Sequence, residues 1–518
     1  MSAKHAQASK QPEEHKHLLA ENKSLKSQIR YLQTHVEKLE EEKRRLLQQK
    51  FGPSSEKDPS PQMRLFNEPE AEADQAAAEE AEETEETVTV PEHKRRKSGR
   101  KPLPDHLPRI EVEHDLSDAE KRCECGCQLT RIGEEVSEQL DIIPAKIQVI
   151  RNIRIKYACK DCEGTVRTAP LPPQPIPKSN ASPGLLSHIV VGKYQDALPL
   201  ARQEKQFARI GVEISRATLA RWMIQLGTLV QPLIHLLRER LLEYDYMGMD
   251  ETRIQVLKEP DRIAASQSCI WVQRGGPPGQ SVILFHYTTS KAARVAEPLL
   301  EAYAGFVQVD GNSTYETLAK AHPEIRLVGC MAHARRKFFE ANQAQGKKGR
   351  TGRAQKGLSL IQKLYGIERA IKDKPAEEKQ SIREERAAPL LEDLHTWALR
   401  SIDEVPPSSL TGKALHYLLE QWPKLIRYLE DGRLSIDNNA TERAIRPFVI
   451  GRRNWLFADT QRGASASANL YSLIETAKAS NIEPYIYLRH IFKELPAAHT
   501  VEQLEAMLPF NLDGQLWR

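Results

Sequence analysis

The sequence lacks long hydrophobic runs and contains few cysteines. No apolar segment of its 518 residues reaches the length of about 20 residues that a membrane-spanning helix needs, and the N-terminus is polar, without the apolar stretch of a secretory signal. These absences exclude a membrane protein and predict a cytoplasmic one. Five of the seven cysteines lie between Cys123 and Cys162. Clustered cysteines in a reducing compartment indicate a metal site rather than disulfides.

The net charge of +4 conceals an asymmetry along the chain. Residues 67–92 contain eleven acidic residues and neither Lys nor Arg, so removing them from the total of +4 leaves +15 on the rest of the chain. A basic body beside one acidic stretch favours a polyanionic partner, with DNA or RNA as the first candidate. An ordinary solvated surface would give the same totals, so charge alone does not separate the two.

A heptad repeat marks residues 16–50. Leucine recurs at every seventh position, and asparagine, β-branched residues and lysine follow four residues later (Leu18, Leu25, Leu32, Leu39 and Leu46; Asn22, Ile29, Val36 and Lys43). This pattern predicts a parallel coiled coil that makes the protein a homodimer or higher oligomer; a long solvated helix is the alternative. Residues 51–104 have too few apolar side chains to form a core, which predicts a disordered linker. Its basic cluster at 93–102 either contacts DNA phosphates or stays solvated.

Two tight groups of cysteines flank a strand-like run within residues 105–170. Tetrahedral zinc is held by four thiolates at about 2.3 Å, and paired knuckles closing a strand hairpin are typical of such a site. We expect a small zinc-binding β unit whose ligands are Cys123, Cys125, Cys159 and Cys162, with Cys127 as a substitute in the first knuckle.

Residues 178–240 show helical periodicity. Two helices around a turn near residue 211 are typical of a helix-turn-helix, with Ser215 as the N-cap of the second helix. That helix would present Arg216, Thr218 and Arg221 to the major groove of DNA. An ordinary helical hairpin is the alternative.

From residue 244 onwards the pattern changes to strands. Residues 244–342 predict three strands, a helix, a strand, a helix, a strand and a helix. This is the order of the ribonuclease H-like fold, in which one acid lies on the first strand and another at the end of the fourth. Asp250 and Asp310 occupy these two places. We expect a helical insertion over 343–425 and the return of the catalytic core over 426–470, giving a multidomain α/β protein.

Phosphodiester transfer explains the need for acids. Two Mg²⁺ ions about 4 Å apart can activate the attacking oxygen and stabilise the leaving one, and such hard cations (Mg²⁺ or Mn²⁺) need carboxylate ligands. Glu442, early in a helix that Asp437 can cap, is the predicted third acid. The competing candidates are Glu475, Glu430 and Glu368.

Basic residues accompany these acids. Arg446 lies one helical turn beyond Glu442, and we expect it, with Arg443, to contact phosphates. The motif His333-Ala334-Arg335-Arg336 predicts a basic helix near the active site and adds His333, Arg335 and Arg336 to the expected DNA contacts. Tyrosine recombinases also use H-x-x-R, but the matching arginine context and tyrosine nucleophile are not evident, and a plain surface helix is the alternative.

These stretches resemble the transposases of the insertion-sequence sixty-six family, a bacterial DDE group. The resemblance covers nearly the whole chain and is carried by the cysteine knuckles and by FGPSSEK (51–57), MDETRIQVL (249–257), VDGNSTYE (309–316), GCMAHARRKFFE (329–340), LYGIER (364–369) and EDGRLSIDNNATERAIRPFVIGRRNWLF (430–457). It implies a ribonuclease H-like DDE domain with its triad at Asp250, Asp310 and Glu442, and a C-terminal domain over 471–518.

The resemblance also implies a partner and a location. The substrates would be the element's own terminal inverted repeats and a target DNA, in the bacterial cytoplasm at the nucleoid, with small accessory proteins of the same element as further partners. One departure is the C-x-C of the first knuckle, where the family also commonly has C-x-x-C.

Two other functions are compatible with parts of the sequence. A non-catalytic dimeric DNA-binding regulator would need only the coil, the zinc unit and the helix-turn-helix, but it has no physical need for the three acids. A ribonuclease H-like nuclease that cuts without joining would need the acids too. Strand-transfer products would distinguish it from a transposase.

Overall fold

The computed structural model describes residues 25–26, 28, 147–158, 166–344 and 352–512. The chain divides into two compact units, residues 67–171 and the remainder. The predicted coiled coil, apart from residues 25, 26 and 28, lies outside the described residues, as do the linker and the five clustered cysteines. Within the described part, no helix is both long and apolar enough to cross a membrane.

The smaller unit contributes one described hairpin. Strands β1 (Lys156–Ala158) and β2 (Val166–Thr168) pair antiparallel, with Lys156 opposite Thr168. The side chain of Arg154 donates to the carbonyl of Ala169 at 2.6 Å and extends the pairing by one step. Strand β1 therefore lies at the end of the strand-like run between the two cysteine groups, and β2 follows the second group in the sequence.

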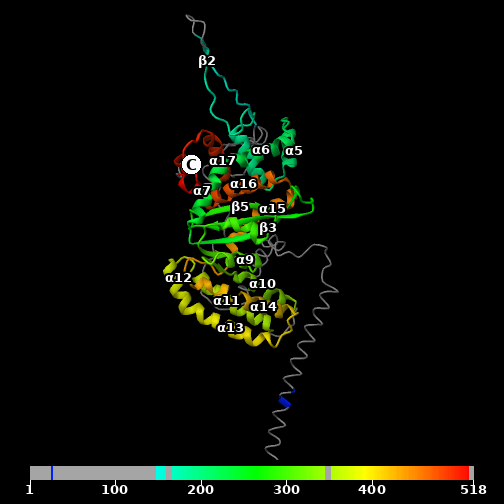
Figure 1. Cartoon of the computed structure of the whole chain (residues 1–518), viewed down its shortest axis with the longest axis vertical. Helices are drawn as coiled ribbons and strands as arrows, with labels where there is room; N and C mark the ends of the chain where they lie inside the picture. The colour runs from blue at the N-terminus through cyan, green and yellow to red at the C-terminus, as the bar shows by residue number, and fades with distance from the viewer. Residues whose placement is uncertain (1–24, 27, 29–146, 159–165, 345–351, 513–518) are drawn as a thin grey trace, which may run out of the picture. The chain divides into compact units, whose positions relative to one another are not determined.

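A mixed sheet forms the centre of the larger unit (Figure 1). Its strands run in the order β5-β4-β3-β6-β7, with β8 paired to the far end of β3. The first three strands are antiparallel neighbours, whereas β6, β7 and β8 add in parallel. The strands are β3 (Tyr246–Lys258), β4 (Gln267–Gly275), β5 (Val282–Thr288), β6 (Gly305–Gln308), β7 (Ile325–Val328) and β8 (Ala458–Thr460).

Short helices connect the parallel strands. The segment 291–303, predicted as one helix, forms only α8 (Ala293–Ala296) and a 3-10 turn, η2 (Glu297–Leu299). Pro298 explains the difference, because it has no N–H to continue the α-helical hydrogen bonding. Helix α9 (Ser313–Ala321) lies between β6 and β7 in the chain and is capped by Asn312.

Strand β5 is an edge of the sheet, and helix α16 (Gln461–Ala479) covers it. Ser472 accepts a hydrogen bond from the backbone N–H of Phe285 at 2.8 Å. The hydroxyl of Thr476 accepts from the N–H of Ile283 and donates to its carbonyl, both at 3.0 Å. Side-chain hydroxyls thus satisfy backbone groups that an open strand edge would leave for another chain.

Helices from both ends of the larger unit share one hydrophobic core with the sheet. Helices α4 and α17 pack together, and α6 packs on α16 so closely that a Cβ on Gly227 would lie 2.4 Å from that of Ala466. The expected domain boundary at residue 471 falls inside α16. The remaining elements here are α4 (Pro183–Tyr194), α5 (Leu200–Arg209), α6 (Arg216–Leu229), α7 (Gln231–Leu242), α17 (Pro484–Glu494), η5 (Leu495–Ala497), α18 (Val501–Glu505) and η6 (Pro509–Asn511).

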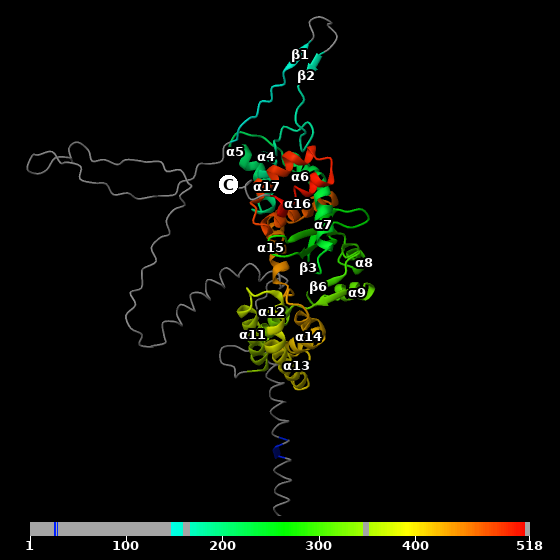
Figure 2. The same cartoon turned by 90° about the vertical axis from the view of Figure 1, so that its left-hand side faces the viewer.

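A second hydrophobic core lies in the helices that follow β7. Helix α10 packs on α11 and α14, and both views place this group on the opposite side of the sheet from α4–α7 and α17 (Figures 1 and 2). The helices are α10 (Met331–Gln343), α11 (Arg353–Ala370), α12 (Ala376–Ile382), the π-helical η3 (Arg383–Ala387), α13 (Ala388–Ile402), α14 (Leu410–Leu425) and η4 (Arg427–Leu429). Helices α11 to α14 occupy the range expected for an insertion.

Candidate active site

The pairing of β3 with β6 brings the first two acids together. Gly248 lies beside Gln308 in the parallel register of these strands. Asp250 follows Gly248 by two residues, and Asp310 follows Gln308 by two residues. Both carboxyl groups therefore lie at the same end of the paired stretch. The charge of Asp310 contributes to the raised pKa of Asp250.

Helix α15 (Asn439–Trp455) carries Glu442 in its first turn and lies directly on β3. The side-chain amide of Asn438 donates to the carbonyl of Met249 at 2.8 Å. A Cβ added to Gly248 would lie only 2.1 Å from Oγ1 of Thr441, so a glycine is needed for this approach. The start of α15 is therefore fixed against the strand residue next to Asp250.

Asp437 was expected to cap this helix, but the N-cap is Asn438. Asp437 lies one residue earlier, where its carboxylate accepts from the N–H of Asn439 at 3.1 Å and from the hydroxyl of Tyr365 at 2.9 Å. The side chain of Asn438 makes no capping hydrogen bond, and its amide instead holds the backbone of β3.

The acids form an electrostatically strained group. Burial raises the pKa of Asp250 well above its usual range, and the charges of Glu251, Glu442 and Asp310 raise it further. Burial also raises the pKa of Asp310, although a hydrogen bond from the N–H of Asn312 at 2.9 Å opposes the effect. Carboxylates that repel one another in a buried place favour a bound cation.

Glu251 is a fourth carboxylate that the sequence analysis missed. Its oxygens accept hydrogen bonds from the amide of Asn312 at 2.5 Å and the hydroxyl of Tyr315 at 2.6 Å, and Lys291 lies 3.7 Å away. Burial and the charge of Asp310 raise its pKa. Its position directly after Asp250 was the available signal, but a neighbouring residue on a strand normally faces the opposite side.

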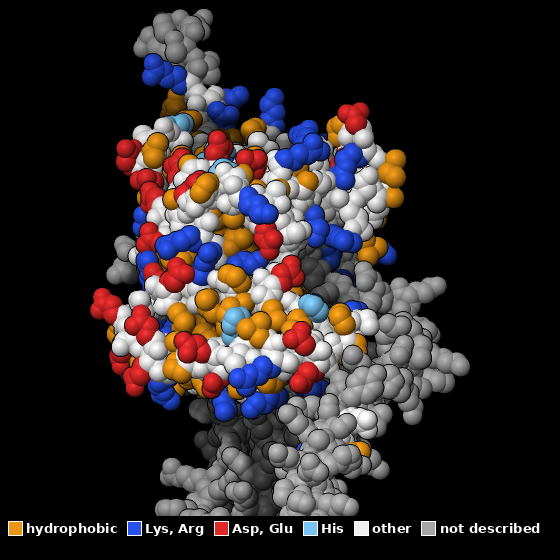
Figure 3. Space-filling view, turned by 60° about the horizontal axis from the view of Figure 1, so that its bottom comes forward, with side chains coloured by type: hydrophobic (Ala, Val, Ile, Leu, Met, Phe, Trp, Pro, Cys, Tyr) orange, Lys and Arg blue, Asp and Glu red, His pale blue; other side chains and the backbone are white. Residues whose placement is uncertain are grey.

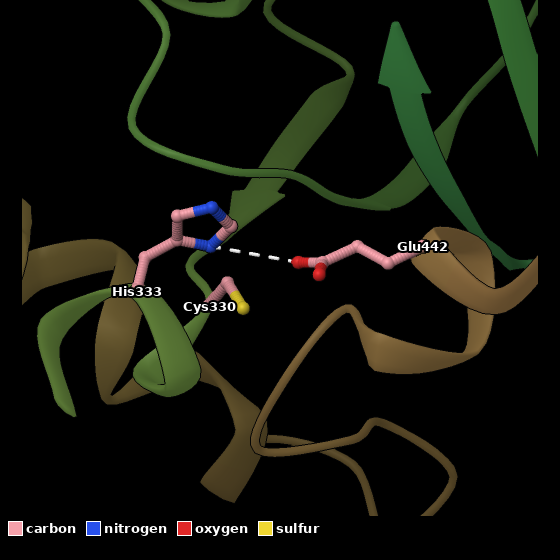
Figure 4. A group of neighbouring side chains, drawn as sticks. All are labelled: Cys330, His333 and Glu442. Carbon is pink, nitrogen blue, oxygen red and sulfur yellow. Dashed lines mark ion pairs between the residues drawn. The ribbon is translucent and has the colours of Figure 1, made fainter. Parts of the chain in front are cut away.

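Glu442 lies between the strands and helix α10 (Figure 4). Its Oε1 is 3.6 Å from Nδ1 of His333, and its Oε2 is 3.8 Å from the guanidinium of Arg336. Cys330, His333 and Glu442 form a group whose possible ligand atoms all lie within 4.8 Å of one another. Two expected DNA contacts, His333 and Arg336, thus face an acid, and Cys330 was not anticipated.

The competing acids lie elsewhere with partners of their own. Glu475 pairs with Lys478 on α16, and Glu430 lies near Arg326. Glu368 accepts two hydrogen bonds from Arg383. Of the four candidates for the third acid, Glu442 is the one whose charge acts on Asp250.

The remaining predicted DNA contacts lie on three helices. Helices α5 and α6 flank a turn at Gly211 (φ +78°), and Ser215 accepts from the N–H of Thr218 at 3.2 Å as the N-cap of α6. Arg216 and Arg221 are exposed on α6. Arg335 and Arg443 are exposed, whereas Arg446 is half-buried.

On one face of the molecule, the surface charge does not indicate a further DNA-binding site. On the face that Figure 3 shows, Lys and Arg side chains are interspersed with Asp and Glu, and hydrophobic side chains lie between them. A single-sign patch of the kind that marks a phosphate path is not evident there among the described residues.

Comparison with known families identifies the class of protein as a transposase. Residues 178–466, more than half of the chain, match the family described as "Transposase IS66 family". The chain belongs to this family. Other regions match "Transposase C of IS166 homeodomain" (38–112), "zinc-finger binding domain of transposase IS66" (120–163) and "IS66 C-terminal element" (472–510). Leucine-zipper, zinc-finger and DDE regions therefore follow one another along the chain, as the sequence predicted.

Similar chains are found in Sinorhizobium fredii (strain NBRC 101917 / NGR234). The "Uncharacterized protein y4jD" is 34% identical over 420 residues, which cover 79% of this chain and 81% of the relative. The "Uncharacterized protein y4qI" is 32% identical over 430 residues, or 81% of this chain and 78% of the relative. The similarity thus extends over most of both proteins.

Proposed function

We propose that this chain is a DNA transposase of ribonuclease H-like fold, which cuts DNA at the ends of its insertion sequence and joins those ends to a target. The observation that carries the proposal is the convergence of Asp250, Asp310 and Glu442 from β3, the end of β6 and α15. The sheet order β5-β4-β3-β6-β7, with an antiparallel first half and a parallel second half, supports the fold assignment.

The three carboxylates fit a pair of Mg²⁺ or Mn²⁺ ions. They are hard oxygen donors, they repel one another, and Oε1 of Glu442 is buried without a hydrogen-bond partner among the described residues. Bound ions would activate the attacking oxygen and stabilise the leaving oxygen. Asn312 holds Asp310 through its backbone N–H, and Asn438 holds the start of α15 on β3, so Asp310 and the helix that carries Glu442 are positioned before DNA arrives.

Basic residues around this group would bind the DNA. In this proposal Arg216, Thr218 and Arg221 of α6 read the terminal inverted repeat in the major groove. The phosphates near the scissile bond would be contacted by a second set of side chains, which come from α10 and α15 (His333, Arg335, Arg336, Arg443 and Arg446). Arg336 is placed to contact such a phosphate, because it lies beside Glu442.

The N-terminal regions would assemble and stabilise the complex. We propose a structural zinc ion on Cys123, Cys125, Cys159 and Cys162, and a homodimer or larger assembly through the coil at 16–50. Small accessory proteins of the same element would join this complex at the nucleoid. Domain boundaries at 105–170, 178–240 and 471–518 belong to the same proposal.

The test is cleavage and joining of DNA that carries the element's ends, with Mg²⁺. Asp250→Asn removes one ligand charge at nearly constant volume and is expected to abolish both products, at least 100-fold, while DNA binding persists. Asp459→Asn is the matched control, because Asp459 is exposed and forms a surface ion pair with Lys258, away from the three acids. Equal products from wild type and Asp250→Asn would overturn the site assignment.

The same assay separates the two alternatives. A nuclease would give cleavage without strand-transfer products. A dimeric regulator would bind the ends tightly and give neither product, with wild type and Asp250→Asn behaving alike.

A further inference from the structure

The first turn of α10 places a thiol and an imidazole side by side. Cys330 is the N-cap of α10 and His333 is three residues later, so both side chains lie at the start of the helix (Figure 4). Cys330 is 1% exposed and His333 is largely buried. Glu442 reaches the same point from α15, which is far away in the sequence.

The spacing of these atoms suits a tetrahedral ion. Bond lengths of about 2.0 Å to nitrogen or oxygen and about 2.3 Å to sulfur give ligand-to-ligand edges of roughly 3.3–3.6 Å. Nδ1 of His333 and Oε1 of Glu442 are 3.6 Å apart, and Sγ of Cys330 completes a group within 4.8 Å. A small rotation of the thiol would close this group around one cation.

The hydrogen bonding leaves the same atoms available. Neither Nδ1 of His333 nor Oε1 of Glu442 has a hydrogen-bond partner among the described residues, although both atoms are buried. The backbone N–H of Asn438 points at Sγ of Cys330 at 3.2 Å, as an outer-shell donor to a metal-bound thiolate would. Buried polar atoms without hydrogen-bond partners need an explanation, and the ability to bind a cation is one.

We propose that Cys330, His333 and Glu442 form a binding site for a thiophilic divalent cation of the zinc class, which overlaps the carboxylate site for Mg²⁺ at Glu442. A thiolate, an imidazole and one carboxylate select such ions, whereas Mg²⁺ prefers oxygen ligands throughout. A thiolate and a carboxylate together neutralise the two positive charges of the ion. The fourth position is open to water or to a DNA oxygen.

This site shares Glu442 with the proposed catalytic group, and the regulatory consequence rests on the proposed function. An ion held by Cys330 and His333 draws Oε1 of Glu442 towards α10 and away from Asp250. Zinc and the catalytic ions therefore compete for one carboxylate. Filling the site is expected to inhibit the Mg²⁺-dependent reaction.

The first experiment counts zinc bound per full-length chain after equilibration at a fixed micromolar zinc concentration. Cys330→Ser is expected to bind one equivalent less than wild type. Cys269→Ser is the matched control, since Cys269 is also a buried free cysteine but lies on β4, and it is expected to keep the wild-type count. Glu442→Gln, which changes the ligand that comes from α15, is expected to lose the same equivalent of zinc. Equal counts in wild type, Cys330→Ser and Glu442→Gln would overturn the proposal.

Cobalt substitution gives a second readout that does not depend on activity. The sulfur-to-cobalt absorption of wild type minus that of Cys330→Ser should show one additional thiolate ligand, and wild type minus Cys269→Ser should show none. Identical spectra for wild type and Cys330→Ser would exclude the thiol as a ligand.

Competition is tested on wild type and Cys269→Ser alone. Loading the additional zinc equivalent should lower Mg²⁺-dependent cleavage at least tenfold in both. Undiminished cleavage with that equivalent bound would refute the sharing of Glu442. If no preparation cleaves DNA while Cys330→Ser still loses one equivalent, the proposed function fails and the zinc site stands.

Discussion

The contact between β3 and α15 allows a sharp test, because a single methyl group would disturb it. In Gly248→Ala the new Cβ would lie 2.1 Å from Oγ1 of Thr441 and 2.7 Å from Oδ1 of Asn438. Ordinary contacts begin at 3.4 Å, so the start of α15 must move away by about 1.3 Å. Both neighbours are buried, at 2% and 3% exposure, and have little room to turn aside.

Two effects of different size follow from that displacement. Overpacking of a buried contact destabilises proteins by about 1–3 kcal/mol, which the protein can survive. A shift of about 1 Å in a catalytic group can lower activity about 100-fold, and Glu442 lies one residue after Thr441. Gly248→Ala is therefore expected to reduce cleavage far more than it reduces the free energy of unfolding.

The assay pairs urea denaturation with Mg²⁺-dependent cleavage of DNA carrying the element's ends. Gly366→Ala is the matched control, because no described atom lies within 4 Å of a Cβ at that helical position. It should keep full activity and gain up to about 1 kcal/mol in stability. The double variant Gly248→Ala, Thr441→Ala should recover part of the stability. Wild-type activity and stability in Gly248→Ala would refute the tight contact.

Three further predictions concern the fold and the rejected acids. Arg383→Met should destabilise the protein by about 3–5 kcal/mol in urea denaturation, because Arg383 is 2% exposed and its loss leaves the carboxylate of Glu368 unpaired; an effect below 1 kcal/mol would contradict this. Ser472→Ala should destabilise the protein by about 1–2 kcal/mol in urea denaturation, since it leaves the buried N–H of Phe285 without its hydrogen-bond acceptor; unchanged stability would contradict this. Burial raises the pKa of Glu475 above 4.5, so its folded state binds more protons and the protein loses stability as pH rises past 4.5. Glu475→Gln should consequently raise the thermal midpoint at pH 7 more than at pH 4 and keep full cleavage activity; a lost activity would return Glu475 to the list of catalytic acids.

The sequence analysis found the elements that carry the acids because their signals are local. Alternation around Asp250 predicts a strand that contains this residue, and the short apolar run before Asp310 predicts a strand that leads to it. The pairing of the two strands is a contact between segments about 60 residues apart, and strand order in the expected fold supplied it. Glu442 was a choice among four acids, because the local sequence does not show which of them approaches Asp250.

The missed features depend on contacts that no local pattern encodes. Glu251 is held by Asn312 and Tyr315, which lie more than 60 residues further along the chain. The role of Cys330 depends on the approach of α15. The helices at 178–240 share a hydrophobic core with the sheet, and the close approach of α6 and α16 at Gly227 is likewise a contact that no local pattern encodes.

The helical insertion has a structural reason to precede Glu442. The chain leaves the sheet after β7 and must return so that α15 starts on β3. Arg383, within the insertion, donates to three backbone carbonyls between residues 428 and 434 and so holds the returning segment. The side-chain amide of Gln308 then donates to the carbonyl of Ser435 at 2.6 Å. The backbone N–H of Met331 donates to the carbonyl of Ile436 at 3.0 Å. The returning chain is thus attached at successive points before it reaches α15, and the position of the third acid depends on the insertion as much as on the sheet.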